Sequence, residues 1–224
     1  MSDYKVAIKI AGELQGSFNS ALKAAQNGLG GLAKVGKVGA AALARGAVAM
    51  GTLAAAGIKA GIEYETAFAG VRKTVDATET QFQALSDGIR GMAKEMPTFA
   101  TEIAGVAEAA GQLGIQTDNI LGFTKTMVTL GDSTNMSADE AATSLARLAN
   151  ITGMPQSSFD RLGSTIVSLG NNFATTESEI TAMGLRIAGA GSQVGMTEAQ
   201  IMSFSAALSS VGIEAEAGGS AFSK

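Results

Sequence analysis

The side chains best suited to chemistry in this sequence are carboxylates that come in close pairs. Two carboxylates held at different pKa values can act as a general acid and a general base. Histidine and cysteine are absent, which excludes the commonest general base, thiol nucleophiles and most zinc sites. Any catalysis would therefore depend on acids, lysines and hydroxyls. The candidate acidic pairs are Glu63/Glu65, Asp139/Glu140, Glu177/Glu179 and Glu214/Glu216.

The spacing of these acids favours a structural role. Residues two apart on a helix do not face each other, and most of the pairs fall in the first turns of predicted helices, where acids stabilise the helix dipole. No Gly-x-Gly fragment follows a strand and leads into a phosphate-binding lysine, so a P-loop is not predicted. The sequence therefore predicts no catalytic residue, no cofactor, no metal site and no enzymatic activity. Its dispersed basic residues also predict no specific nucleic-acid binding.

These acids belong to a series of predicted short helices. Between residues 82 and 211, apolar residues recur seven times at relative positions 0, 3, 7 and 10, which forms one stripe about three turns long at 3.6 residues per turn. The spacing predicts seven helices and an all-α fold. The runs are Phe82/Leu85/Ile89/Met92, Ile103/Val106/Ala110/Leu113, Ile120/Phe123/Met127/Leu130, Ala138/Ala141/Leu145/Leu148, Phe159/Leu162/Ile166/Leu169, Ile180/Met183/Ile187/Ala190 and Ile201/Phe204/Leu208/Val211.

Helix stop and start signals separate the runs. A glycine followed by a hydrophobic residue fits a left-handed C-cap with its apolar contact, and this pair occurs at Gly114-Ile115, Gly153-Met154, Gly195-Met196 and Gly212-Ile213. A hydroxyl residue followed three positions later by Glu or Gln fits a capping box. Ser137, Thr176 and Thr197 open such boxes, so we expect helices to begin there.

Charge and composition set the first quarter of the chain apart. Residues 1–60 carry seven basic and two acidic residues, and the remainder carries nine basic and eighteen acidic ones. Apolar residues make up 46% of the chain, enough for a core, but many are Ala, which buries little area per residue, so we expect partners to add to the burial. The absence of cysteine and of an apolar leader after Met1 indicates a product made in the cytoplasm.

Two elements are expected in this first quarter. Tyr4, Val6, Ile8 and Ile10 alternate with polar residues or Ala, which predicts a short strand within an N-terminal arm of residues 1–13. Residues 14–76 form an Ala/Gly-rich helical segment for oligomerisation or for lining a lumen. Its glycines each cost about 1 kcal/mol in a helix, so we expect residues 14–61 to become ordered only in an assembly.

The apolar seam of residues 18–57 is the basis for that expectation. Its members follow one another at alternating steps of four and three, the spacing of helices that supercoil around each other. They are Phe18, Leu22, Ala25, Leu29, Leu32, Gly36, Gly39, Leu43, Gly46, Met50, Leu53 and Gly57. The seam predicts self-association in parallel copies. Residues 38–58 could also span a bilayer in length, about 31 Å as a helix, but Arg45 opposes insertion, which leaves transient membrane contact as the expectation.

A set of motifs resembles a known family in both order and number. They are Met96-Pro-Thr-Phe-Ala-Thr-Glu102, Ala109-Ala-Gly-Gln-Leu-Gly-Ile115, Met136-Ser-Ala-Asp-Glu-Ala-Ala142, Thr175-Thr-Glu-Ser-Glu-Ile180, Gly195-Met-Thr-Glu198 and the closing stretch from Ala206 to Phe222. Together they resemble the phage tail tape measure proteins of the TP901 core-region type, over residues 62–224. Where that family often has Gly-Thr-Ala, this chain has Gly219-Ser-Ala221, a conservative difference.

The resemblance implies a structural protein of the phage tail. Such proteins are made in the host cytoplasm and act in the tail lumen of the virion, where they set tail-tube length, bind tail-tip proteins and assembly chaperones, and leave ahead of the genome during ejection. It also implies that residues 77–224 are a core-like helical domain cut short at the C-terminus, with the ruler and any lytic domain beyond it. Two other classes fit the same residues: a membrane-active helical protein and a helical-repeat scaffold.

Overall fold

The structure, a computed structural model, describes residues 59–222 of the 224-residue chain. The chain divides into two compact units, residues 1–60 and residues 61–224. The strand expected in residues 1–13, the seam of residues 18–57 and the segment 38–58 all lie outside the described residues. The three-part division predicted from the sequence stays a prediction, since most of its first two parts lies there as well.

The described residues are helical and contain no strand, which confirms the predicted all-α class. A helix over residues 59–74 comes first. It is followed by α3 (Glu79–Glu95), α4 (Ala100–Gln112), α5 (Ile120–Ser133), α6 (Ala138–Thr152), α7 (Phe159–Asn172), α8 (Glu177–Gln193), α9 (Glu198–Ser210) and α10 (Ala215–Phe222), with short 3-10 turns at η1 (Thr117–Asn119) and η2 (Gln156–Ser158). Within this part of the chain no helix combines the length and apolar character that crossing a membrane requires.

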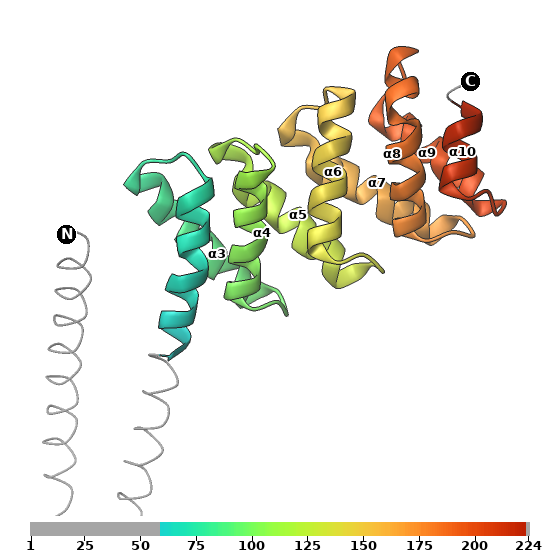
Figure 1. Cartoon of the computed structure of the whole chain (residues 1–224). Coiled ribbons are helices and arrows are strands. Elements are labelled where there is room, and N and C mark those ends of the chain that lie inside the picture. Colours follow the sequence, from blue (N-terminus) through green and yellow to red (C-terminus); the bar gives the residue numbers. More distant parts are fainter. Residues whose placement is uncertain (1–58, 223–224) are drawn as a thin grey trace, which may run out of the picture. The chain divides into compact units, whose positions relative to one another are not determined.

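The helices of residues 79–222 lie in two rows, as Figure 1 shows. Along one row α3, α5, α7 and α9 contact one another in turn, and along the other α4, α6, α8 and α10 do so. Each helix from α3 to α9 also packs against a helix of the opposite row. Helix starts recur at nearly constant intervals, at Ile120, Phe159 and Glu198 in one row and at Ala138, Glu177 and Ala215 in the other. This is the architecture of a helix-pair repeat, in which each pair buries its apolar face against its neighbours.

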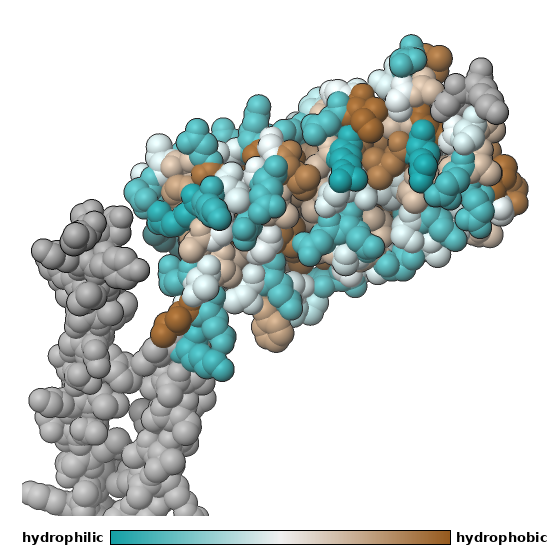
Figure 2. Space-filling model, in the orientation of Figure 1, coloured by the Kyte–Doolittle hydropathy of each residue, from teal (hydrophilic) through white to brown (hydrophobic). Residues whose placement is uncertain are grey.

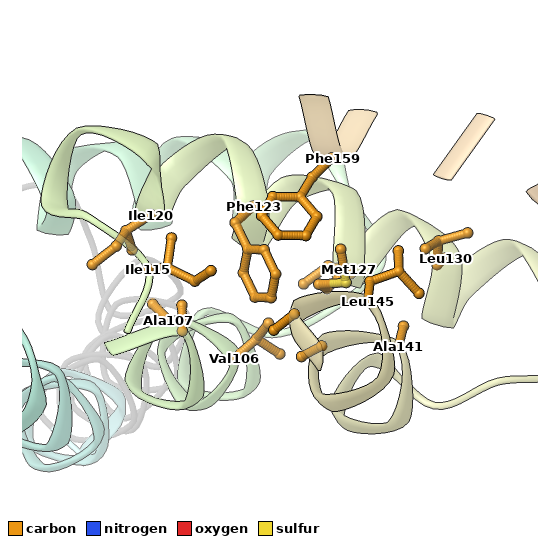
Figure 3. Packing of buried hydrophobic residues seen from close by; sticks show 14 of the residues in the cluster. Val106, Ala107, Ile115, Ile120, Phe123, Met127, Leu130, Ala141, Leu145 and Phe159 are labelled. Atoms are coloured by element: carbon orange, nitrogen blue, oxygen red, sulfur yellow. The ribbon is translucent and has the colours of Figure 1, made fainter. Parts of the chain in front are cut away.

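The core is continuous from the helix of residues 59–74 to α9. At its centre the rings of Phe123 and Phe159 meet edge to face, with centroids 4.7 Å apart, and Figure 3 shows Met127 and Leu145 beside them. Phe68 and Val71, from the helix of residues 59–74, join the same core. The helix of residues 59–74 therefore packs with the later helices through these side chains.

All four predicted glycine joints adopt the left-handed conformation. The φ angles are 78° at Gly114, 71° at Gly153, 81° at Gly195 and 80° at Gly212. The residue after each glycine donates its backbone N–H to a carbonyl five positions earlier, for example Met154 to Ala149 at 3.0 Å. Because non-glycine residues adopt this conformation at a cost, the local sequence alone fixes these helix ends.

Each of the seven predicted stripes lies on a separate helix, but the last was oriented wrongly. In α9 the buried residues are Ile201, Met202, Ser205 and Ala206, whereas Phe204 and Val211 are 38% and 72% exposed. The helix carries apolar residues on two faces, and contacts with α7 and α8 decide which of them faces inward. The eighth labelled helix, α10, was not predicted, because its eight residues include two glycines and no apolar repeat.

Candidate functional site

Two of the acidic candidates stabilise helix starts. Glu140 accepts the backbone N–H of Ser137 at 2.9 Å, and Glu179 accepts that of Thr176 at the same distance. In return the Ser137 and Thr176 hydroxyls accept the backbone N–H groups of these glutamates. The backbone N–H groups, followed by the hydroxyls, lower the pKa of Glu140 and of Glu179. Both carboxyls are therefore held ionised as caps, which is the opposite of what a general acid at neutral pH requires.

Two other candidates form surface ion pairs. Glu65 accepts from Arg90 at 2.9 Å, and Glu216 accepts from Arg186 at 2.9 Å. The side chains of all four residues are about half exposed or more, so each pair contributes at most about 1 kcal/mol. Arg90 also lies 4.5 Å from the centre of the Tyr64 ring, which ties the helix of residues 59–74 to α3. These acids join neighbouring helices.

Three acids that the sequence did not group lie around one hollow. Glu102, Asp132 and Asp139 line a depression of about 450 Å³ between α4, α5 and α6. The Thr98 hydroxyl donates to Asp132 at 2.8 Å. Across residues 59–222 no three acidic side chains are arranged to hold a metal ion. Of the predicted acidic residues only Asp139 lies here, so the structure does not bring the sequence-predicted pairs together.

Hydrogen bonds between side chains connect successive helix pairs along one edge of the array. They start from the loops that join the α3 row to the α4 row. Thr98 bonds to Asp132 at the end of α5, Asn135 bonds to Ser178 at the start of α8, and Thr175 bonds to Ser209 at the end of α9. Sequence reasoning did not identify these residues, because each pair is 34 or 43 positions apart. The recurrence of polar residues before successive capping positions was the only signal of them.

The apolar surface of the described residues includes a shallow groove beside α9. Its volume is about 730 Å³, and Val194, Met196, Ala199, Ser203, Phe204 and Ala207 contribute to its walls. Val194 and Val211 are 75% and 72% exposed at the two ends of α9. Figure 2 shows hydrophobic residues interspersed with hydrophilic ones over the half of the array that ends in α10. Single exposed apolar residues are common on protein surfaces, so the groove alone does not identify a binding site.

The predicted acids have structural positions in the described part of the chain. Glu140 and Glu179 cap helices, Glu65 and Glu216 form ion pairs, and Asp139 lines the open hollow. A chemical step needs a nucleophile and a base within hydrogen-bond reach of each other. The arrangement of the predicted acids described above does not provide such a pair.

Comparison with known proteins identifies the family of the chain. Residues 86–224, more than half of the chain, match the family described as phage-related minor tail protein. No curated protein and no solved structure matches the chain. The matched region begins within α3 and includes every helix from α4 to α10. The chain therefore belongs to the family of phage-related minor tail proteins, structural components of the virion tail.

Proposed function

We propose that this protein is the tape measure protein of a phage or phage-like tail. The family match over residues 86–224 carries the proposal, because it makes the chain a tail component. The ordered motifs between Met96 and Phe222, which resemble the tape measure core region, narrow the role. In this role several parallel copies occupy the tail lumen, set tube length during assembly and leave ahead of the genome. The protein acts without enzymatic activity in its described part.

The array of helix pairs in residues 79–222 fits a role in tail assembly better than a role in measuring tail length. A continuous helix can measure length, because each residue extends it by a fixed rise of about 1.5 Å. Residues 79–222 instead turn back at every joint, and their helices lie side by side. We therefore assign length measurement to parts of the protein other than residues 59–222. The array provides surfaces for tail-tip proteins, the tube or assembly chaperones.

Electron microscopy of tails tests the tape measure role. The gene is deleted in the phage and supplied in trans, either intact or with an in-frame duplication in a long helical stretch of its full reading frame. We expect the deletion to abolish tails of normal length. We expect the duplication to lengthen tails by about 1.5 Å per added residue. If the duplicated gene gave tails of unchanged length, the protein would not be the ruler. It would still be a component of the tail.

A helical-repeat scaffold is the second candidate function. The regular recurrence of helix starts in both rows favours it, because such arrays offer extended binding surfaces. Normal tail assembly after gene deletion would favour this candidate over the tape measure.

The proposed membrane contact of residues 38–58 needs a test of its own. Dye release from liposomes by the purified full chain at neutral pH measures it. We expect little release in the absence of a delivery signal, since Arg45 opposes insertion. Rapid release would instead identify a membrane-active protein.

A further inference from the structure

The side of α9 that faces away from α7 carries an aromatic ring where the earlier helices of its row carry threonine. In α5 the corresponding side meets the next helix, because a Cβ at Gly163 of α7 would lie 2.8 Å from the methyl group of Thr126. Aligning the first residues of α5, α7 and α9 places Thr126, Thr165 and Phe204 at one position. Phe204 therefore lies where α9 would contact the next helix of its row. The described residues contain no such helix.

The neighbouring positions extend this apolar side, which we call the end face (Phe204, Leu208 and Val211). Val211 is 72% exposed, and the corresponding residue of α5 is the polar Ser133. The centroid of the Phe204 ring also lies 5.4 Å from that of Phe222 in α10. A terminal pair of a repeat array needs a polar outer face to remain soluble when nothing covers it. The composition of the end face therefore indicates a partner that covers it.

At the opposite end of the array, one side of the helix of residues 59–74 is exposed and carries mostly apolar or small side chains. We call it the start face (Ile62, Thr66, Ala69 and Lys73), whose members follow one another at steps of four and three and so lie along one stripe. Ile62 is 63% exposed, and Thr66 and Ala69 are exposed as well. The Thr66 hydroxyl donates to the backbone carbonyl of Ile62 at 2.8 Å, so it already has a partner. The start face is thus suited to an apolar contact up to Lys73.

The start face and the end face are complementary in size. In the contact between α5 and α7, Gly163 leaves the space that the methyl group of Thr126 occupies. The larger Phe204 needs small residues opposite it, because the side chains at a contact set the distance between helix axes. Thr66 and Ala69 in the middle of the start face meet this need.

The two faces are also complementary in charge. Residues 187–222, which include the end face, contain three acidic residues and no basic residue. Lys73 and Glu214 are both exposed, and neither takes part in an ion pair within residues 59–222. Two end faces paired with each other would bring like charges together, which disfavours that contact. A start face brings Lys73 instead.

The direction of the rows brings these two charges together. Successive helices turn back at each joint, so the helices of one row run in the same direction, as Figure 1 shows for α4, α6, α8 and α10. A helix in the next place of the α9 row would therefore run parallel to α9. If the helix of residues 59–74 took that place, its last turn, with Lys73, would lie beside the joint between α9 and α10, which carries Glu214.

We propose that the start face of one copy of this chain packs against the end face of a second copy. The contact joins two different surfaces, so each copy keeps one face available for a further copy. Association of this kind continues along a line or closes into a ring. The inference uses only the surfaces of residues 61–222 and does not rest on the proposed function.

Cysteine crosslinking between copies of the full chain tests this contact. The chain has no cysteine, so Ala69→Cys places a single thiol on the start face and Ala207→Cys places one beside the end face. Both alanines are exposed. The two variants are mixed in equal amounts and treated with a short bismaleimide, and gel electrophoresis measures the covalent dimer. Ala69→Cys mixed with Ser168→Cys is the matched control, because Ser168 is the exposed residue of α7 that corresponds to Ala207.

We expect several-fold more dimer from the mixture of Ala69→Cys and Ala207→Cys than from either variant alone or from the control mixture. Lys73→Glu in the Ala69→Cys chain should lower this yield. Adding Glu214→Lys to the Ala207→Cys chain should restore it, because the exchanged charges attract again. Dimer formed mainly by Ala207→Cys alone would show that two end faces pair, and would overturn the proposal. Equal yields in all mixtures, or no dimer in any of them, would overturn it as well.

Discussion

The middle of the helix array and its C-terminal end are packed by different kinds of side chain. In the middle, α5, α6 and α7 bury large residues such as Phe123, Leu145 and Phe159. At the end, α8, α9 and α10 approach through glycines that meet flexible side chains, as Gly184 meets Met202 and Gly218 meets Met183. Large rigid side chains specify one arrangement, whereas methionine adapts to its neighbours. We therefore expect the middle to be the more rigid part of the array and the end to adjust more easily.

The largest expected effect comes from a substitution in the middle. Phe123→Ala removes a ring that is 1% exposed and packs edge to face with Phe159. It should destabilise the unit by about 3–5 kcal/mol, through lost burial and the cavity left behind. Phe99→Ala is the control, because Phe99 is 72% exposed, and it should change stability by no more than about 0.5 kcal/mol. Urea denaturation followed by circular dichroism measures both, and similar midpoints for the two variants would contradict a framework centred on Phe123.

A pair of glycine substitutions tests whether the two regions differ in rigidity. A Cβ at Gly131 would lie 2.9 Å from the backbone nitrogen of Ala138, which cannot move without shifting α6. A Cβ at Gly184 would meet the terminal methyl group of Met202, which can rotate away. Gly131→Ala should therefore cost about 1–3 kcal/mol. Gly184→Ala should be close to neutral, because the gain in helix propensity of about 1 kcal/mol offsets the repacking of methionine.

A lower melting temperature for Gly184→Ala than for Gly131→Ala would show that the methionine-lined end is the rigid part. Equal melting temperatures would show that the two regions do not differ in rigidity.

The joint between α8 and α9 gives a smaller effect. Gly195 has φ 81°, and a Cβ there would meet no atom within 4 Å. The cost of Gly195→Val is thus a backbone cost alone, about 1–2 kcal/mol or more. Gly105→Ala is the matched control, since Gly105 lies inside α4 with the same open space, and it should stabilise by about 0.5–1 kcal/mol. An unchanged denaturation midpoint for Gly195→Val would mean that the left-handed joint does not hold α9 in place.

Acid should distinguish the start of α6 from the start of α9, with the smallest of these effects. The pKa of Glu140 is lower in the folded chain than its ordinary value of 4.5, so the ionised form favours folding. This contribution is complete above that value and is lost as the pH falls through the lowered pKa. The α9 box uses Gln200, which does not titrate.

Glu140→Gln keeps a capping box of the α9 kind, so the variant should lose part of the acid sensitivity of the α6 start while remaining folded at neutral pH. Stability measured between pH 3 and pH 7 checks this. Parallel pH profiles for the variant and the unmodified chain would show that the cap does not contribute through its charge.

The predictable features are those that depend on local sequence. A left-handed joint needs a glycine, and a capping box needs a hydroxyl and a Glu or Gln three positions later, so Gly153 and Ser137 could be assigned without a structure. The helical stripe of Phe159, Leu162 and Ile166 likewise fixed the inward face of α7, where no other apolar face competes.

What could not be predicted depends on tertiary contacts. In α9, Phe204 and Met202 lie on two different apolar faces. Only packing against α7 and α8 makes the face of Met202 the buried one. The hydrogen bond between Asn135 and Ser178 spans 43 residues, and the recurrence of polar residues before capping positions does not reveal the partner of each one. Thr124 shows the same limit, because its hydroxyl is fully buried without a hydrogen-bond partner, an arrangement that local sequence rules do not anticipate.

Quantitative mass spectrometry of purified particles is the decisive test of a structural role in the tail. Intact tailed particles and particles emptied by triggered genome ejection are banded on density gradients, and peptides from residues 86–224 are counted against the tail-tube protein. We expect several copies in each intact particle and a large loss from emptied ones. Absence of these peptides from intact particles, with the protein abundant in the lysate, would contradict its assignment as a structural component of the tail.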